Sequence, residues 1–131
     1  MRAVFQQELS EVQSRLVSLA ETSEKIMDKA SRAFLNSDVS MADEALALAE
    51  ANEERALDLD ELVIKVLATQ SPVARDLRIL VSALRMSASL ERMAHSHLTL
   101  LLLRATATQE ARFQNRCARP SRTWRELTLS L

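Results

Sequence analysis

Two pairs of side chains at helical spacing are the first candidates for chemistry in this sequence. Glu54 and Asp58 are four residues apart, and so are Glu91 and His95. Residues at i and i+4 lie on one face of a helix. Two carboxylates in this arrangement can hold a hard cation, and a Glu/His pair is compatible with a transition metal. Either pair also arises by chance on a solvated helix face, so neither pattern is specific.

Other charged residues follow a helix-start signal. Ser71-Pro72 combines a good N-cap with a proline suited to the first helical position. Asp76 then falls in the first turn, where a carboxylate favours the helix dipole and can pair with Arg75 or Arg78. We find no Ser/His/acid set for nucleophilic catalysis and no glycine loop for phosphate. The sequence therefore does not predict an enzyme.

The composition indicates an all-α fold. The 131 residues are 47% apolar and include two Pro, one Cys and no Gly. Tight hairpins need Gly or Asn-Gly, so a β-sheet is not expected. No apolar run approaches the roughly 20 residues of a membrane span. A single Cys rules out a disulfide framework, and we expect a cytosolic protein.

Apolar periodicity predicts three long helices. A polar cluster at residues 36–40 supplies Asp38 or Ser40 as a cap before the second helix, whose apolar face is thin between Ala49 and Ala56. Short connections make neighbouring helices antiparallel, which predicts an up-down-up three-helix bundle over residues 1–103. The stripes consist of Phe5, Leu9, Val12, Leu16, Leu19, Ile26, Met27, Ala30 and Phe34; then Met41, Ala45, Leu48, Leu59, Leu62, Val63, Val66 and Leu67; then Val73, Leu77, Leu80, Val81, Leu84, Ala88 and Met93.

The C-terminal part, residues 104–131, has a different character. Residues 1–103 hold 11 Lys and Arg against 16 Asp and Glu, a net charge of −5, whereas residues 104–131 hold six Arg against two Glu, a net of +4. The apolar periodicity decays after Met93, and we assign no regular structure to this basic tail. It lacks an amphipathic pattern or a recognisable nucleic-acid module, so nucleic acid is not expected as a partner.

Three segments resemble the PhoU family of phosphate-transport regulators: MRAVFQQEL at the start, QSPVARDLRILVSAL in the middle, and ASLERM after it. The likeness covers about residues 1–97. Packing does not account for Asp76, Arg78, Glu91 and Arg92, and these are the residues that the family pattern retains. The resemblance implies an all-α, PhoU-like fold of which this chain holds one of the usual two three-helix repeats. It also implies a cytoplasmic, often dimeric protein.

The resemblance further implies the partners and the role. Family members are implicated in restraining the phosphate ABC transporter, through its ATPase subunit, and the sensor histidine kinase when phosphate is plentiful. Such a protein reaches the membrane only through its partners. Two alternatives stay open: a metal-binding or storage bundle, and a generic helical interaction module.

Some family members bind iron or zinc clusters, magnesium or manganese through acidic Glu/Asp-x-x-x-Asp motifs. Glu54 to Asp58 matches that motif as it stands. The second copy keeps Glu91 and Arg92, but Ala94 replaces Gly and His95 replaces the acid. No cofactor is certain on this basis, and we expect at most one divalent, iron or zinc ion at the acidic helix face.

The length and the tail depart from the family pattern. One hypothesis explains both: the tail is an out-of-frame reading of a gene that continues into a second bundle. A back-translation of Ala111 to Glu126 read from its third base gives ALPEPLRETFADMAR, which is typical of a helical continuation. With its second bundle missing, the first is expected to expose apolar surface and to dimerise or aggregate.

Overall fold

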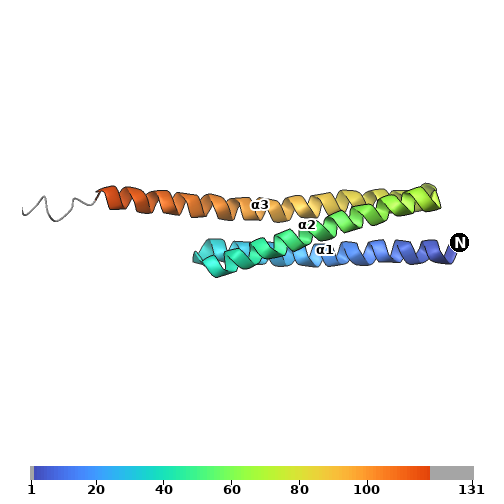
Figure 1. Ribbon diagram of the computed structural model, residues 1–131, viewed down its shortest axis with the longest axis horizontal. Helices are drawn as coiled ribbons and strands as arrows, with labels where there is room; N and C mark the ends of the chain where they lie inside the picture. The colour runs from blue at the N-terminus through green and yellow to red at the C-terminus, as the bar shows by residue number, and fades with distance from the viewer. Residues whose placement is uncertain (1, 119–131) are drawn as a thin grey trace, which may run out of the picture. The chain divides into compact units, whose positions relative to one another are not determined.

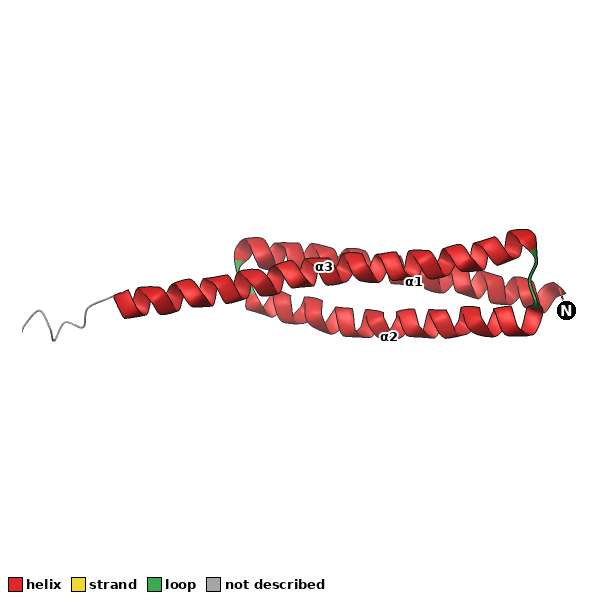
Figure 2. Cartoon of the chain, turned by 90° about the horizontal axis from the view of Figure 1, so that it is seen from above, coloured by secondary structure: helices red, strands yellow, loops and turns green. Residues whose placement is uncertain are grey.

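The computed structural model describes residues 2–118, which form three helices: α1 (Arg2–Asn36), α2 (Val39–Gln70) and α3 (Ala74–Ala118) (Figure 1). No strand occurs among these residues. The two connections are short, so α2 runs antiparallel to α1 and α3, while α1 and α3 run in the same direction. Figure 2 shows the three helices from above. The predicted all-α, antiparallel three-helix bundle is confirmed.

The chain divides into two compact units, residues 1–101 and 102–131. The first unit contains α1, α2 and the part of α3 that packs with them. Within the second, α3 remains helical to Ala118, where the sequence analysis assigned no regular structure. Residues 104–118 contain no Gly or Pro and are rich in Ala, Gln and Arg, which favour a helix without an apolar stripe. The predicted boundary after residue 103 stays a prediction, and residues 119–131 of the tail lie outside the described residues.

The turn between α1 and α2 has the expected cap. Asp38 takes an extended conformation, and its Oδ1 accepts a hydrogen bond from the backbone N–H of Met41 at 3.1 Å. This bond satisfies one of the free N–H groups at the start of α2. The cap prediction is therefore confirmed for Asp38 rather than Ser40.

The turn between α2 and α3 differs from the prediction that Ser71 caps α3. Ser71 instead ends α2 in a left-handed conformation, with φ 44° and ψ 55°, and α3 begins at Ala74, which also has a positive φ of 46°. Reversing the chain over three residues requires left-handed backbone. A chain without glycine must place side chains there, at a cost of about 1–2 kcal/mol each.

Core positions in all three helices repeat at alternating intervals of three and four residues, the spacing of a coiled coil. In α2, the buried positions from Ala45 to Val66 follow this spacing through Asn52, Ala56, Leu59 and Val63. The buried apolar side chains form two clusters. One contains Leu9, Val12, Leu19, Ala56, Leu59, Val63, Val66, Leu80 and Ala83, and the other contains Ile26, Ala30, Ala33, Ala45, Ala94, Leu98 and Leu101.

A buried polar layer lies between the two clusters. Asn52 is 2% exposed, and its Nδ2 donates to the Oγ of the fully buried Ser23 at 3.1 Å; Ser23 in turn donates to the carbonyl of Leu19 at 2.8 Å. Beside them, Arg55 Nη1 donates to Thr22 Oγ1 at 2.9 Å. Both interhelical bonds join α1 to α2, so they fix the register of that pair. The thin stretch of apolar face predicted between Ala49 and Ala56 is where Asn52 lies.

The predicted stripe of α3 is partly wrong. Leu80 is buried as expected, but Val73 is 75% exposed, and Leu77, Val81 and Met93 are exposed as well. The buried row of α3 consists of Leu80, Ala83, Ser87 and Ala94. Leu77 and Val81 lie on a neighbouring face of the helix, one residue further round. Because α3 is apolar on more than one face, periodicity alone selected a neighbouring row. Among residues 2–118, no helix carries an apolar stretch long enough to cross a membrane.

Replacing Ser71 by glycine should stabilise the protein. Glycine adopts the left-handed conformation without the side-chain clash, and its greater freedom in the unfolded chain offsets only part of the gain. We expect the Ser71→Gly variant to gain about 0.5 kcal/mol in unfolding free energy, measured by urea denaturation. Ser14→Gly, in the exposed interior of α1, is the matched control and should lose about 0.5 kcal/mol. A loss of stability in Ser71→Gly would contradict the left-handed assignment.

Candidate functional site

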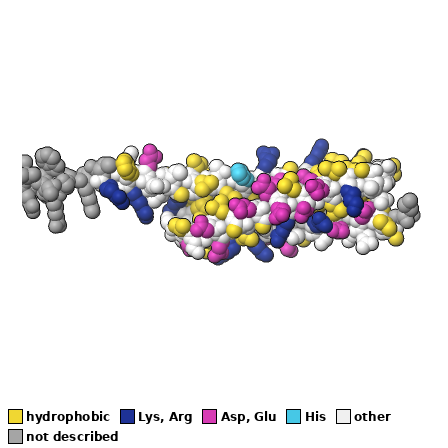
Figure 3. All heavy atoms as spheres, in the orientation of Figure 1, with side chains coloured by type: hydrophobic (Ala, Val, Ile, Leu, Met, Phe, Trp, Pro, Cys, Tyr) yellow, Lys and Arg dark blue, Asp and Glu magenta, His cyan; other side chains and the backbone are white. Residues whose placement is uncertain are grey.

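Three carboxylates from two helices approach one another beside the core. Glu91 of α3 is half-buried, and Asp60 and Glu53 of α2 lie close enough for their charges to act on it. Burial, and then the negative charges of Asp60 and Glu53, raise the pKa of Glu91 above its ordinary value of 4.5. Burial also raises the pKa of Asp60, whose Oδ1 is buried without a hydrogen-bond partner. Figure 3 shows acidic side chains gathered over the middle of the bundle.

Sequence reasoning found Glu91 but missed its two neighbours. Glu53 and Asp60 are seven residues apart, and each directly follows a buried position of α2, Asn52 and Leu59. Such flanking positions face the neighbouring helix across the edge of a coiled-coil core. Glu91 likewise follows Leu90, which packs against the core. The three-four spacing of the core was therefore the signal that could have found them.

The four residues predicted as metal ligands belong to no group of three or more possible ligands among the described residues. Glu54 and Asp58 are both exposed on α2, and His95 is exposed on α3, one turn beyond Glu91. Over residues 2–118, no three His, Cys, Asp or Glu side chains are arranged so that they could hold a metal ion together. A metal at Glu54 and Asp58, or at Glu91 and His95, stays a prediction resting on two ligands each.

The remaining motif residues are spread along α3. Asp76 lies half-buried in the first turn, and its backbone N–H donates to the carbonyl of Val73 at 3.2 Å. Arg78 is exposed two residues later, and Arg92 is exposed next to Glu91. Asp76 and Arg78 thus lie near the start of α3, about 20 Å along the helix from Glu91 and Arg92. They form two separate surface positions rather than one catalytic centre.

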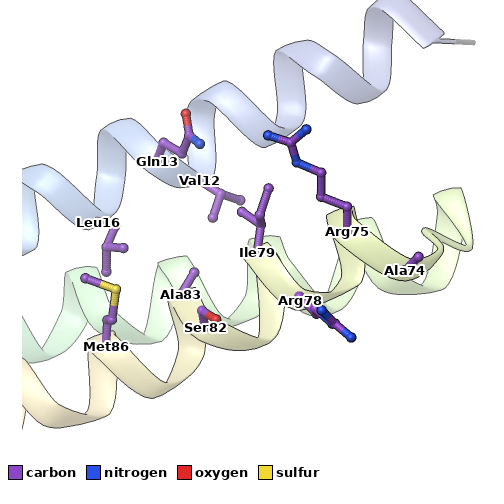
Figure 4. A pocket seen from close by; sticks show the side chains of 10 residues that line it. All are labelled: Val12, Gln13, Leu16, Ala74, Arg75, Arg78, Ile79, Ser82, Ala83 and Met86. Atoms are coloured by element: carbon purple, nitrogen blue, oxygen red, sulfur yellow. The ribbon is translucent and has the colours of Figure 1, made fainter.

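A groove runs between α1 and α3 near the start of α3 (Figure 4). It has a volume of about 600 Å³. Its lining is mostly apolar, with two arginines and no acidic residue: Val12, Gln13, Leu16, Ala74, Arg75, Arg78, Ile79, Ser82, Ala83 and Met86. Ile79, Ala83 and Met86 point towards Val12 and Leu16 across the groove. Arg75 extends towards α1, while Arg78 points away from it.

Comparison with known proteins identifies the family of this chain. The family model of the PhoU domain matches residues 16–97, which is more than half of the chain. The chain belongs to the PhoU family. The matched PhoU region includes every predicted site residue, from Glu54 to His95.

Curated relatives carry the same family name. A phosphate-specific transport system accessory protein PhoU homolog 1 from Mycobacterium leprae is 34% identical over 93 residues, covering 71% of this chain and 42% of the relative. PhoU homolog 2 from Mycobacterium tuberculosis is 33% identical over 93 residues, 71% of this chain and 44% of the relative. A PhoU homolog from Pseudomonas putida is 30% identical over 89 residues, 68% and 35%.

This PhoU-family chain spans less than half the length of these curated relatives. No solved structure shows a significant match to it. The comparisons therefore establish the family of the three-helix region, and they leave the residues of the groove without an assigned role.

Neutralising Glu91 should stabilise this PhoU-family bundle near neutral pH. Because the folded state raises the pKa of Glu91, its contribution to stability is full below about pH 4.5 and is lost as the pH rises through the raised pKa. We expect Glu91→Gln to raise the melting temperature by a few degrees at pH 7, with the difference shrinking towards pH 4.5. Thermal unfolding by circular dichroism across that range measures it.

The matched control for this prediction is Glu24→Gln. Glu24 is exposed on α1 and is not among the charges that act on Glu91. It should change the melting temperature little at either pH. A Glu91→Gln variant that is less stable than the original protein at pH 7 would contradict the account of a half-buried carboxylate disfavoured by burial and by two nearby negative charges.

Proposed function

We propose that this chain acts in the regulation of phosphate uptake and phosphate-starvation signalling. The observation that carries the proposal is the PhoU-domain match over residues 16–97, together with curated relatives named as accessory proteins of the phosphate-specific transport system. The proposed action is repression when phosphate is plentiful, in the cytoplasm. We propose contact, rather than catalysis, as the mechanism.

The proposed partners are the ATPase subunit of the phosphate ABC transporter and the sensor histidine kinase. The side chains of Arg78 and Arg92 support a contact mechanism, since both are exposed on α3. Neither makes an ion pair within the described residues. A free guanidinium group on a helix can pair with a carboxylate of a docking protein. We propose that Asp76 and Glu91, which are half-buried on α3, contribute to the same partner contacts.

Self-association is also proposed for this chain. Several large apolar side chains are exposed within residues 2–101, among them Val17, Leu57 and Ile64. Exposed apolar surface of this kind is commonly covered in an oligomer. A metal ion at Glu54 and Asp58 would sit on the same exposed face of α2 as Leu57, and its role would be to adjust such a contact.

Removing the gene should derepress phosphate-starvation genes in phosphate-rich medium, because the repressing contact is lost. A transcriptional reporter for those genes measures the effect, and we expect its signal to rise several-fold. Complementation with the original chain should restore repression. A reporter that stays unchanged after deletion would contradict the proposed function.

Complementation with variants tests the contact mechanism. Arg92→Glu should restore less than half of the repression while the protein keeps its helical content, because it reverses the charge of an exposed contact residue. Lys65→Glu is the control: it makes the same reversal at an exposed position of α2 outside the family motif. Equal repression by the two variants would contradict a role for Arg92.

A further inference from the structure

The groove between α1 and α3 has the form of an unfilled helix-packing site. The α3 side of its lining runs from Ala74 to Met86, which is about 18 Å along the helix and more than three turns. Ile79 and Met86 are seven residues apart, with the small side chains Ser82 and Ala83 between them. Alternating large and small residues at this spacing provide the holes into which side chains of another helix insert.

Val12 and Ala83 are buried parts of the groove lining, and Met86 remains available to a partner. Met86 is 53% exposed although it lies in the lining next to Leu16. Leu80 belongs to the core cluster and lies outside the lining, whereas Ala83 belongs to both. Burying Met86 under a partner helix would therefore add to the apolar area removed from water without disturbing the core.

Charge distinguishes the two ends of the groove. Arg75 and Arg78 lie at the end next to the start of α3, and no ion pair within residues 2–118 engages either of them. The amino terminus of α3 adds a partial positive charge at the same end, which the carboxylate of Asp76 in its first turn offsets in part. Gln13, Ser82 and the apolar lining carry no charge, so the groove is electropositive at one end only.

Two copies of this chain would not complement each other if their grooves faced one another. Its lining contains two arginines and no Asp or Glu, so groove-to-groove pairing about a twofold axis would bring no carboxylate to either arginine. Placing another element of a second copy in the groove would be a head-to-tail contact, which continues into open chains unless its rotation closes.

We propose that this groove binds an amphipathic helix of a partner protein, lying antiparallel to α1 and α3, with carboxylates in its last turn beside Arg75 and Arg78. The antiparallel direction brings the negative end of the partner's helix dipole to the electropositive end of the groove. Apolar side chains at i, i+3 or i+4, and i+7 of the partner would fill the holes beside Ile79 and Met86. This inference rests on the proposed function, since it supplies the contact surface through which the regulator would act.

The test uses two helical peptides of about 15 residues, locked by a hydrocarbon staple on the polar face and labelled with a fluorophore. Both carry the same leucine stripe; one has two Glu in its last turn and the other has two Lys. Fluorescence anisotropy with the full chain measures their affinities. We expect the Glu peptide to bind at least tenfold more tightly, and the double variant Arg75→Glu, Arg78→Glu to reverse that preference.

A matched pair of methionines tests the position of the site. Met86→Glu should weaken binding of the Glu peptide at least tenfold, because it places a charge in the apolar lining. Met93→Glu makes the same change one heptad further along α3, at a residue 49% exposed and outside the groove, and should leave binding within twofold. Circular dichroism shows whether each variant keeps its helical content.

Three results would overturn the inference: equal affinity for the two peptides, equal loss in the two methionine variants, or self-association of the chain that Arg75→Glu abolishes. The first two remove the groove as an acidic-helix site, and the third assigns it to a second copy. The reporter assay distinguishes a failure of the groove assignment from a failure of the proposed function. If the peptides fail these tests while deletion of the gene still derepresses the reporter, only the groove assignment is lost.

Discussion

The hydrogen bond between Asn52 and Ser23 is the constraint on which the rest of the bundle depends. Apolar side chains in a heptad pattern pack almost equally well when one helix slides by a turn past another, whereas a buried amide has few places where it finds a partner. Sliding α2 against α1 would leave Asn52 Nδ2 without its partner, at about 1–3 kcal/mol for a buried unpaired group, while Ser23 Oγ would keep its bond to the carbonyl of Leu19. The polar layer therefore sets the register, and the two apolar clusters on either side supply most of the stabilisation.

The packing of α3 against the pair of α1 and α2 determines which of its residues face a partner. With Leu80 and Ala83 buried in the core, Arg75, Arg78 and Met86 remain exposed, and Ile79 is half-buried. The same packing brings Glu91 close to Asp60 and Glu53, and burial, followed by these two negative charges, disfavours its ionised form. A bundle of plain architecture thus carries two surface features that packing does not explain, an electropositive groove and a half-buried acidic group. Both are consistent with a protein that works by contact.

The sequence predicted the three helices, the Asp38 cap and the direction of each helix, because these depend on local signals and on short connections. It failed where the outcome depends on which of several possible partners a side chain meets. Leu77 and Leu80 are equally apolar, and only the packed bundle decides that Leu80 is buried. Ser71 is a residue type that favours a helix start, but in the turn between α2 and α3 it ends α2 in a left-handed conformation. Sequence spacing did not find Glu53 and Asp60, whose charges act on Glu91 across the helices, whereas the metal site at Glu54 and Asp58 stays a prediction.

Native-state hydrogen exchange is the most direct test of the claim that residues 1–101 form one bundle whose register is set by the polar layer. The account predicts that buried amides of α1, α2 and α3 on both sides of Asn52 become exposed together, in one cooperative unfolding event. It also predicts that Asn52→Ala lowers the protection of all three helices by the same free energy. Exchange of α3 well before α1 and α2, or a loss of protection in Asn52→Ala confined to one helix, would contradict it.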